Sequence, residues 1–328
     1  MHGDDFTFMG VQAELEKMRA KMEEWYEIKF RGIMGSGQGN ISEIVILGRT
    51  LRWTNWGVEY EADSKHREIL VEKMGLDDNA NAVVGPAVRE DQEEGDNGEE
   101  QELQGQACTD FRAAAARLNY LSQDRSDIQF ATKEICREMA KPTSKVWRKV
   151  KRAVRYMIGA KRLVWHMDDR EEEMALDVFA DSDWAGCKSS RKSTSGGMIV
   201  VGGTVVKSWS RTQKTRALSS GEAEFYALTS AAAEALGMQA VAKDMGWDLK
   251  ITVHTDSTAA KSMCSRRGLG KCRHMETKFL WLQQTVRRGK ITVKKVDGPK
   301  NPADMLTKPQ SRKEFADKLW EVGGELRD

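Results

Sequence analysis

Four acidic residues that lie far apart in the sequence could act together in catalysis. Asp181 and Asp256 each come at the end of a predicted strand, and Asp304 lies in the first turn of a predicted helix. Strand C-termini in mixed sheets open into a crevice, and helix N-termini stabilise negative charge. These three carboxylates are therefore candidates for one acidic site.

The fourth candidate lies near the start of a long helix that we predict at about residues 221–244. Ser219 and Glu222 have the Ser-x-x-Glu spacing of a capping box, which would engage Glu222 in holding the helix start. Glu224 lies on a different face of the helix, so it is the predicted site residue. Asp183 and Glu222, the near neighbours of the preferred residues, stay possible substitutes.

A cluster of three or four carboxylates has one common physical justification, because hard divalent cations bound through oxygen neutralise its mutual repulsion. Two Mg²⁺ ions, or Mn²⁺ in their place, could activate a water and stabilise the leaving oxygen of a phosphodiester. A single acidic residue at a strand end or helix start is more often a cap or a turn residue. The metal-site hypothesis therefore depends on the joint arrangement of all four side chains.

The segment from residue 174 onwards predicts the elements that would position this site. Alternating apolar residues indicate strands, and longer periodic stretches indicate helices. The order is three strands, a helix, a strand, two helices, a strand and a closing helix, which predicts an α/β fold with a mixed five-stranded sheet flanked by helices. The expected strands are 174–180, 198–201, 204–209, 249–256 and 290–296, and the expected helices are 221–244, 257–265, 275–288 and 302–320.

The first part of the chain predicts a smaller number of strands and several helices. Residues 11–34 indicate an amphipathic helix and a following strand, and residues 41–62 indicate two strands joined at 54–57. Residues 64–76 indicate a helix that stops at Gly75. Three further helices are expected at 109–121, 127–139 and 145–159.

One short motif is similar in sequence to a polymerase active site. The residues Trp-His-Met-Asp-Asp at 165–169 are similar to the Tyr-Met-Asp-Asp hairpin, but Arg and three Glu follow them, and the pattern offers no second strand for a hairpin. We therefore expect this stretch to be a solvated linker.

The charge of the chain is unevenly distributed, although 52 basic and 50 acidic residues give a formal net charge of only +2. Residues 90–102 hold eight acids and no apolar residue, a composition typical of a disordered linker. By contrast, residues 141–162 hold nine Lys and Arg and no acid, and residues 261–318 hold sixteen Lys and Arg against five acids. Such basic surfaces favour a phosphate backbone, although solvated faces with no partner remain an equal alternative.

Several classes of protein are excluded by composition. The sequence has no apolar run long enough to span a membrane, and its acidic start is unlike a secretory leader, so we expect an intracellular protein, nuclear or cytoplasmic. Five scattered cysteines without a Cys-x-x-Cys pair indicate reduced thiols. The spacing of Cys264, Cys272 and His274 is not that of a structural zinc site, even with His254 added. His274 is expected to orient a helix or to contact substrate.

Several long motifs follow one another in the second half of the chain, namely FADSDWAG at 179–186, RKSTSGG at 191–197, SWSRTQKTRALSSGEAEFYAL at 208–228, HTDSTAA at 254–260, CRHMETKF at 272–279 and NPADMLTKP at 301–309. These motifs resemble those of the Pol polyproteins of copia-type LTR retrotransposons. Residues 176–309 resemble their ribonuclease H domain, and residues 109–161 are similar to the end of their reverse transcriptase, while residues 11–88 are a divergent match to its preceding part.

The resemblance implies a fold, an activity and a partner. It implies a ribonuclease H-like domain at 173–328, a helical end of reverse transcriptase at 108–172, an acidic disordered linker at 89–107 and a divergent reverse-transcriptase segment at 1–88. It also implies that Asp181, Glu224, Asp256 and Asp304 bind two Mg²⁺ ions and that the substrate is an RNA–DNA hybrid, whose RNA strand is hydrolysed. Other parts of the Pol polyprotein are possible partners.

Two departures from the family limit what the resemblance implies. The loop at 297–300, before the last helix, lacks the histidine of cellular and retroviral ribonucleases H, as is usual among copia-type domains. Nothing in the sequence resembles the polymerase palm, so we expect no polymerase activity from this chain alone. A non-catalytic nucleic-acid-binding remnant is the main alternative, and a relative acting only on DNA, such as an integrase or resolvase, is a weaker one.

Overall fold

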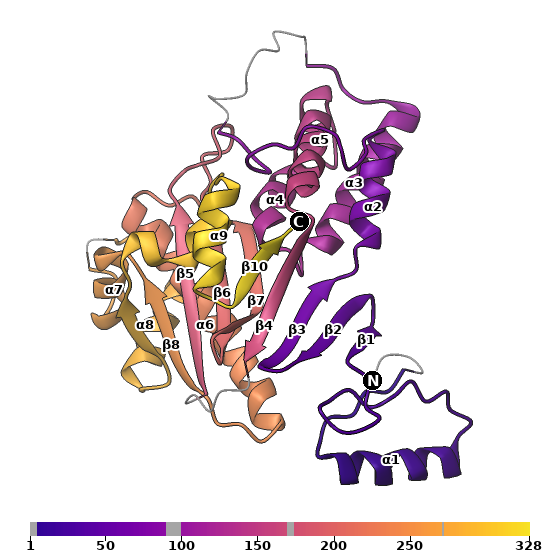
Figure 1. The fold of residues 1–328 in the computed structure, drawn as a ribbon. Coiled ribbons are helices and arrows are strands. Elements are labelled where there is room, and N and C mark those ends of the chain that lie inside the picture. Colours follow the sequence, from indigo (N-terminus) through magenta and orange to yellow (C-terminus); the bar gives the residue numbers. More distant parts are fainter. Residues whose placement is uncertain (1–4, 90–99, 169–173, 271) are drawn as a thin grey trace.

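The computed structural model describes residues 5–89, 100–168, 174–270 and 272–328. It holds two five-stranded sheets, here called the first and the second sheet, with helices between and around them (Figure 1). Most of the acidic stretch predicted as a linker, residues 90–99, lies outside the described residues. Its end at 105–107 already belongs to a helix.

The second sheet is the one predicted to hold the acidic site. Its strand order is β7-β6-β5-β8-β9, with β5, β6 and β7 antiparallel and with β8 and β9 parallel to β5. This mixed sheet confirms the predicted ribonuclease H-like fold class. Its strands are β5 (Ala175–Asp183), β6 (Thr194–Val201), β7 (Thr204–Thr212), β8 (Lys250–Thr255) and β9 (Thr292–Lys295).

Residues of β6 show how the second sheet joins two cores. Ile199 packs in the core under the helix α6 (Ser220–Asp244), whereas its neighbours Met198 and Val200 pack in the core on the opposite face. Alternate residues of a strand point to opposite faces, so a strand buried on both faces is apolar throughout. The helices α7 (Thr258–Ser265) and α8 (Trp281–Arg287), with the short η3 (Thr277–Leu280), complete the α6 side.

Two glycines of β6 let other segments approach the sheet closely. A Cβ at Gly196 would collide with η5 (Pro302–Leu306) and with Thr307, and a Cβ at Gly197 would collide with the ring of Trp209. Glycine at 196 therefore allows η5, with Asp304, to lie directly against the sheet, and glycine at 197 makes room for the Trp209 ring.

The single closing helix predicted at 302–320 is wrong. The structure has η5, then a separate helix α9 (Arg312–Trp320), then the strand β10 (Gly324–Arg327). Pro309 lacks the N–H that a continuous helix needs, and Ser311 begins α9 with a complete capping box to Glu314. The break places the residues between η5 and α9 in a loop beside the acidic site.

The first sheet is antiparallel throughout, in the order β1-β2-β3-β4-β10. The predicted turn at 54–57 joins β2 to β3, which confirms that hairpin. The strand β10 comes from the end of the chain, so the first sheet includes residues from within the segment 173–328. Its strands are β1 (Glu43–Ile46), β2 (Arg49–Thr54), β3 (Gly57–Ala62), β4 (Arg162–Asp168) and β10.

The prediction of a solvated linker at 165–169 is wrong, because all of it but Asp169 belongs to β4, and Asp169 lies outside the described residues. Trp165 is buried, and its indole N–H donates to the carbonyl of Asp124 at 3.0 Å. The strands that flank β4 are β3 and β10, which are remote in the sequence. A local pattern could not indicate that pairing.

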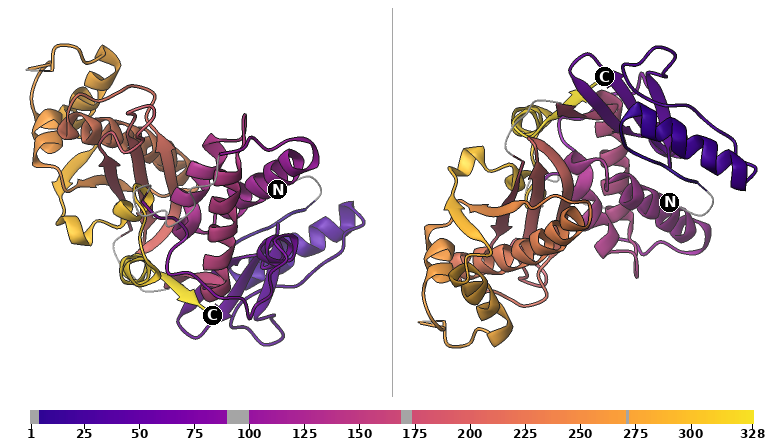
Figure 2. Two further views of the ribbon diagram at one scale, coloured as in Figure 1. Left: turned by 90° about the horizontal axis from the view of Figure 1, so that it is seen from above. Right: turned by 90° about the horizontal axis from the view of Figure 1, so that it is seen from below.

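A mainly helical block connects the two sheets, and it includes the three helices predicted at 109–121, 127–139 and 145–159. It consists of α2 (Lys65–Lys73), α3 (Gly105–Leu121), η2 (Ser126–Ile128), α4 (Gln129–Arg137) and α5 (Ser144–Gly159). Tyr156 of α5 packs edge-on against Phe315 of α9, and both belong to the core that includes Met198. The helical block and the second sheet therefore share one apolar core. Figure 2 shows the two lying side by side.

The helix α1 (Gln12–Trp25) lies beside the first sheet, far from α7 and α8 (Figures 1 and 2). Met22 is its buried side chain, while Trp25 is exposed. The strand predicted after this helix is wrong, since residues 26–33 form no strand and Met34 makes one isolated bridge with Ile41. Within the described residues, no helix is long and apolar enough to cross a membrane.

Candidate active site

Three of the predicted acidic residues meet at one edge of the second sheet. Asp181, Glu224 and Asp256 each offer an oxygen, and these oxygens lie within 4.8 Å of one another. The strands β5 and β8 are parallel neighbours, so Asp181 near the end of β5 and Asp256 just after β8 reach the same edge. Glu224 is added from the first turns of α6, which crosses β5.

Burial and like charge both act against ionisation of this acidic triad. Burial raises the pKa of Asp181 to about 6, and the charges of Asp304 and Asp256 add to the effect. Burial raises the pKa of Glu224 to about 9, again with help from Asp181 and Asp256. The pKa of Asp256 is raised for the same reasons. Without a bound cation, the site therefore favours protonated carboxyl groups.

Hydrogen bonds hold the triad but leave one atom without a partner. The backbone N–H of Ser182 donates to Glu224 Oε1 at 3.2 Å, and the hydroxyl of Thr307 donates to Asp181 Oδ2. Glu224 Oε2 is buried and has no hydrogen-bond partner among the described residues. This buried carboxylate oxygen has no hydrogen-bond donor and lies beside two more carboxylates. Together the three carboxylates form a set of oxygen ligands that fits a hard divalent cation.

Asp304, the fourth predicted ligand, is not a member of this group. Its carboxylate forms ion pairs with Lys308 and Lys318 and accepts a hydrogen bond from Gln310 at 2.8 Å. It is still close enough for its charge to raise the pKa of Asp181 and Asp256. The structure therefore brings together three of the four predicted residues and places the fourth beside them, neutralised by lysines.

The two possible substitutes have other partners. The carboxylate of Glu222 accepts hydrogen bonds from the Leu218 N–H at 3.0 Å and from the Tyr226 hydroxyl, and it pairs with His274 at 2.9 Å. The Glu222 N–H donates to Ser219 as predicted, at 3.2 Å. Asp183 accepts from the N–H of Thr194, and burial raises its pKa to about 6. Neither carboxylate belongs to the triad.

The histidines and cysteines considered for zinc do not gather. His254 Nε2 lies 2.7 Å from Asp177 Oδ1, and His274 is joined to Glu222. Among the described residues, the acidic triad is the one group of three or more His, Cys, Asp or Glu side chains that lie close enough to share a metal ion. His274 thus ties its loop to the start of α6.

Thr307 and Lys308 are site residues that the sequence-based prediction missed. Thr307 donates a hydrogen bond to Asp181, and Lys308 pairs with Asp304. The charge of Lys308 also opposes part of the rise in the pKa of Asp181 and of Asp256. Their positions directly after Asp304 and η5 were the available signal. A hydroxyl and an ammonium next to a predicted ligand are natural donors to neighbouring carboxylates.

The sequence is similar to retrotransposon proteins of plants. It is 26% identical over 218 residues to the retrovirus-related Pol polyprotein from transposon RE2 of Arabidopsis thaliana, covering 66% of this chain and 15% of that protein. It is 28% identical over 209 residues to the retrovirus-related Pol polyprotein from transposon TNT 1-94 of Nicotiana tabacum. That match covers 62% of this chain and 16% of the other protein. The chain is similar to the Pol polyproteins of copia-type retrotransposons. The resemblance predicted from the motifs is confirmed, and the chain spans 15–16% of the length of these Pol polyproteins.

No family model matches the chain. Among solved structures, it is similar to the foamy viral protease–reverse transcriptase in complex with an RNA/DNA hybrid. That match covers 78% of this chain and 29% of the other, with 12% sequence identity and a TM-score of 0.43.

Proposed function

We propose that this chain is a divalent-cation-dependent nuclease that hydrolyses the RNA strand of RNA–DNA hybrids. The observation that supports it most is the convergence of Asp181, Glu224 and Asp256 from three separate elements, in a buried site where their pKa values are raised. Such an arrangement costs stability unless a ligand compensates for it. Similarity to Pol polyproteins supports a nucleic-acid substrate.

The triad would hold the cations, and neighbouring residues would hold the triad. Bound Mg²⁺ would supply the positive charge that activates a water and stabilises the leaving oxygen of a phosphodiester. The Ser182 N–H orients the carboxylate of Glu224, and the Thr307 hydroxyl orients that of Asp181. Asn301 donates to the Ala180 carbonyl at 3.0 Å and so fixes η5 against the strand that ends in Asp181.

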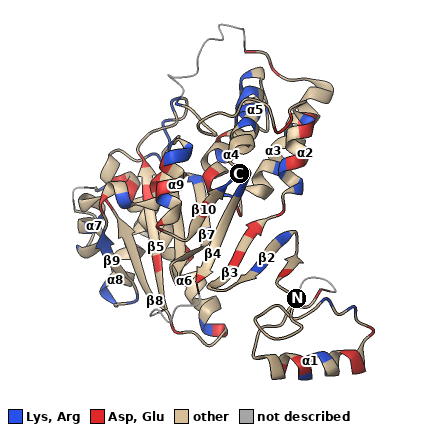
Figure 3. Cartoon of the chain, viewed as in Figure 1, with Lys and Arg blue, Asp and Glu red and all other residues tan. Residues whose placement is uncertain are grey.

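The choice of the RNA strand would depend on contacts to its 2′-hydroxyl groups and to the shape of the hybrid, with basic side chains on the phosphates. Lysine and arginine gather on α5 and on the elements after β8, as Figure 3 illustrates.

A hybrid-cleavage assay tests this function directly. The full chain is incubated with Mg²⁺ and an RNA–DNA hybrid labelled on the RNA strand, beside RNA and DNA duplexes of the same sequence. We expect cleavage of the hybrid, and a loss of about a thousandfold or more in Asp256→Asn, because one cation ligand is removed. Asp248→Asn, an exposed substitution before the start of β8, is the matched control. Equal rates in the two variants would overturn the proposal.

One observation favours the alternative of a non-catalytic nucleic-acid-binding protein. Lys308 and Lys318 neutralise the carboxylate of Asp304, where the proposed nuclease would use a metal ion. The same assay decides between the two functions, since folded wild-type protein that binds the hybrid and does not cleave it would support the alternative. Cleavage of duplex DNA instead would support a relative that acts only on DNA.

A further inference from the structure

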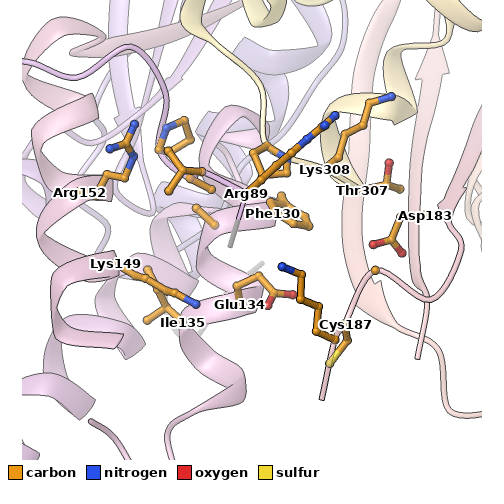
Figure 4. A pocket seen from close by; sticks show the side chains of 17 residues that line it. Arg89, Phe130, Glu134, Ile135, Lys149, Arg152, Asp183, Cys187, Thr307 and Lys308 are labelled. Atoms are coloured by element: carbon orange, nitrogen blue, oxygen red, sulfur yellow. The ribbon is translucent and has the colours of Figure 1, made fainter. Parts of the chain in front are cut away.

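A cavity of about 270 Å³ lies between the helical block and the second sheet, next to the acidic triad (Figure 4). We call it the basic pocket. Residues 86–89, α4 and α5 form one side, and residues 183–188 and 307–309 form the other. Its wall bears five cationic side chains and two carboxylates, namely Arg89, Lys149, Arg152, Lys188, Lys308, Glu134 and Asp183.

Cationic side chains outnumber carboxylates on the wall of the basic pocket, and Lys149, Arg152 and Lys188 already have interaction partners. Glu134 already pairs with Lys133 and Arg137, which are not part of the wall. Lys308 pairs with Asp304. Lys149 and Arg152 come from α5 on one side, and Figure 4 places them across the pocket from Asp183 and Lys308. An anion in the pocket would therefore meet positive charge from both halves of the molecule.

The floor of the basic pocket is apolar. It includes Phe130, Ala131 and Ile135 of α4, with Pro86 and Pro309 from the two loops. The ring of Phe130 is partly exposed and points into the space between the two sides (Figure 4). A cavity with an aromatic floor and a cationic rim suits a ligand with a flat or apolar part and a phosphate.

The basic pocket adjoins the acidic site through two consecutive residues. Thr307 lines the pocket and donates to Asp181, and Lys308 lines the pocket and pairs with Asp304. A strand that places one phosphodiester at the triad would therefore pass close to the pocket. This contiguity distinguishes the pocket from basic patches elsewhere on the surface.

We propose that the basic pocket binds one nucleotide unit of a nucleic-acid strand, with its phosphate among Lys149, Arg152 and Lys188 and its sugar or base on Phe130. The proposal deepens the proposed function, on which it rests for the identity of the strand as part of an RNA–DNA hybrid. The chemistry it requires, a nucleoside phosphate, is shared by a polynucleotide and a free nucleotide. The experiment separates these two sources.

Binding is measured without catalysis, by fluorescence anisotropy of a labelled RNA–DNA hybrid with the full chain in EDTA at several salt concentrations. We expect Lys149→Ala and Lys188→Ala each to weaken binding about three- to tenfold and to reduce the slope of log K against log salt by about one. The matched control is Lys243→Ala near the end of α6, about 28 Å along the helix axis from Glu224. Lysine variants that bind like this control would overturn the proposal.

Phe130→Leu tests the apolar part of the ligand without a change of charge. We expect about threefold weaker binding at an unchanged salt slope, because a stacking surface is lost. Thermal unfolding of each variant, measured in parallel, distinguishes a lost contact from a lost fold. Unchanged affinity in Phe130→Leu would overturn the assignment of a nucleotide, since a site for phosphate alone would remain.

Competition experiments identify the source of the nucleotide. Adenosine monophosphate should displace the hybrid only at concentrations far above the hybrid's Kd, and inorganic phosphate should be weaker still. Displacement by the mononucleotide near the hybrid's own Kd would overturn the strand assignment in favour of a free nucleotide. Cleavage by wild type, together with lysine variants that bind like the control, would refute the pocket and leave the nuclease intact. Weakened binding in the lysine variants, together with no cleavage by wild type, would refute the nuclease and leave the pocket intact.

Discussion

The two sheets bury carboxylates in opposite ways. In the first sheet and the helices beside it, buried acids contact arginine: Glu59 pairs with Arg327 at 2.8 Å, Glu61 with Arg162 at 2.6 Å, and Asp127 with Arg125 at 2.6 Å. In the second sheet, Asp181, Glu224 and Asp256 face one another.

The pKa values follow this difference. Burial alone would raise the pKa of Glu61, but hydrogen bonds from Arg162 and Arg52 lower it. Burial raises the pKa of Glu224 to about 9, and its acidic neighbours add to the shift. A buried acid with a cationic partner serves the fold, whereas buried acids that repel one another indicate a binding site. Substitutions in both regions can break or sharpen this contrast.

The largest effect is expected for Asp127→Asn. Asp127 and Arg125 are both buried, and the substitution leaves a buried guanidinium without its counter-charge. We expect a loss of about 3–5 kcal/mol in the free energy of unfolding, measured with urea. The double variant Arg125→Met/Asp127→Leu should recover most of it, and a loss below about 1 kcal/mol in the single variant would contradict the structural role of the pair.

A gain in stability is expected for Glu224→Gln in metal-free protein. The folded pKa of Glu224 is raised from 4.5 to about 9, so its stabilising contribution is complete below about pH 4.5 and is lost as the pH rises through 9. At about pH 6.5, about two units above the unfolded pKa, the variant should be more stable than wild type by about 2–3 kcal/mol. Urea unfolding in EDTA across this pH range measures the difference, with Asp248→Asn as control. A less stable Glu224→Gln would refute the repulsion.

A smaller loss is expected for Glu61→Gln, which weakens contacts to Arg52 and Arg162. The unfolding free energy near neutral pH should fall by about 1–2 kcal/mol. Because the folded pKa of Glu61 lies below 4.5, its contribution is present above that pH and is lost as the pH falls through the folded value. Wild type and variant should therefore converge in acid. A constant difference down to the lowest pH would argue against the ion pairs.

The smallest effect is expected for Glu234→Gln on the outside of α6. Glu234 pairs with Lys207 at 2.6 Å and Arg211 at 2.5 Å, but these partners are 40% and 53% exposed. Solvent screens such pairs, so the unfolding free energy should change by about 0.5 kcal/mol or less. A change as large as that of Glu61→Gln would show that pairing alone, rather than burial, sets the cost.

The second sheet could be predicted from the sequence because its signals are local. Alternating apolar residues indicate β5 and β8, and the Gly202-Gly203 turn between β6 and β7 indicates a hairpin. The strand β4 and the terminal strand β10 could not be predicted, because each is stabilised by a partner more than a hundred residues away. The same limit applies to the break between η5 and α9, where a capping box begins a new helix.

The candidate site shows the same division. The spacing of Ser219 and Glu222 indicated that Glu222 would be engaged at the helix start, and the structure joins it to Leu218, Tyr226 and His274. The ion pair of Asp304 with Lys318 depends on how α9 folds back, which no local spacing encodes.

The sequence by itself determined the types of most elements and the positions of the acidic residues at their ends, because periodicity and capping act between residues a few positions apart. Only the tertiary structure decided which carboxylates face each other, which face a cation, and that a basic pocket lies between the helical block and the second sheet. Electrostatic interactions fall off with distance in space and not with separation along the chain, so the chemical role of each acid depends on the folded arrangement.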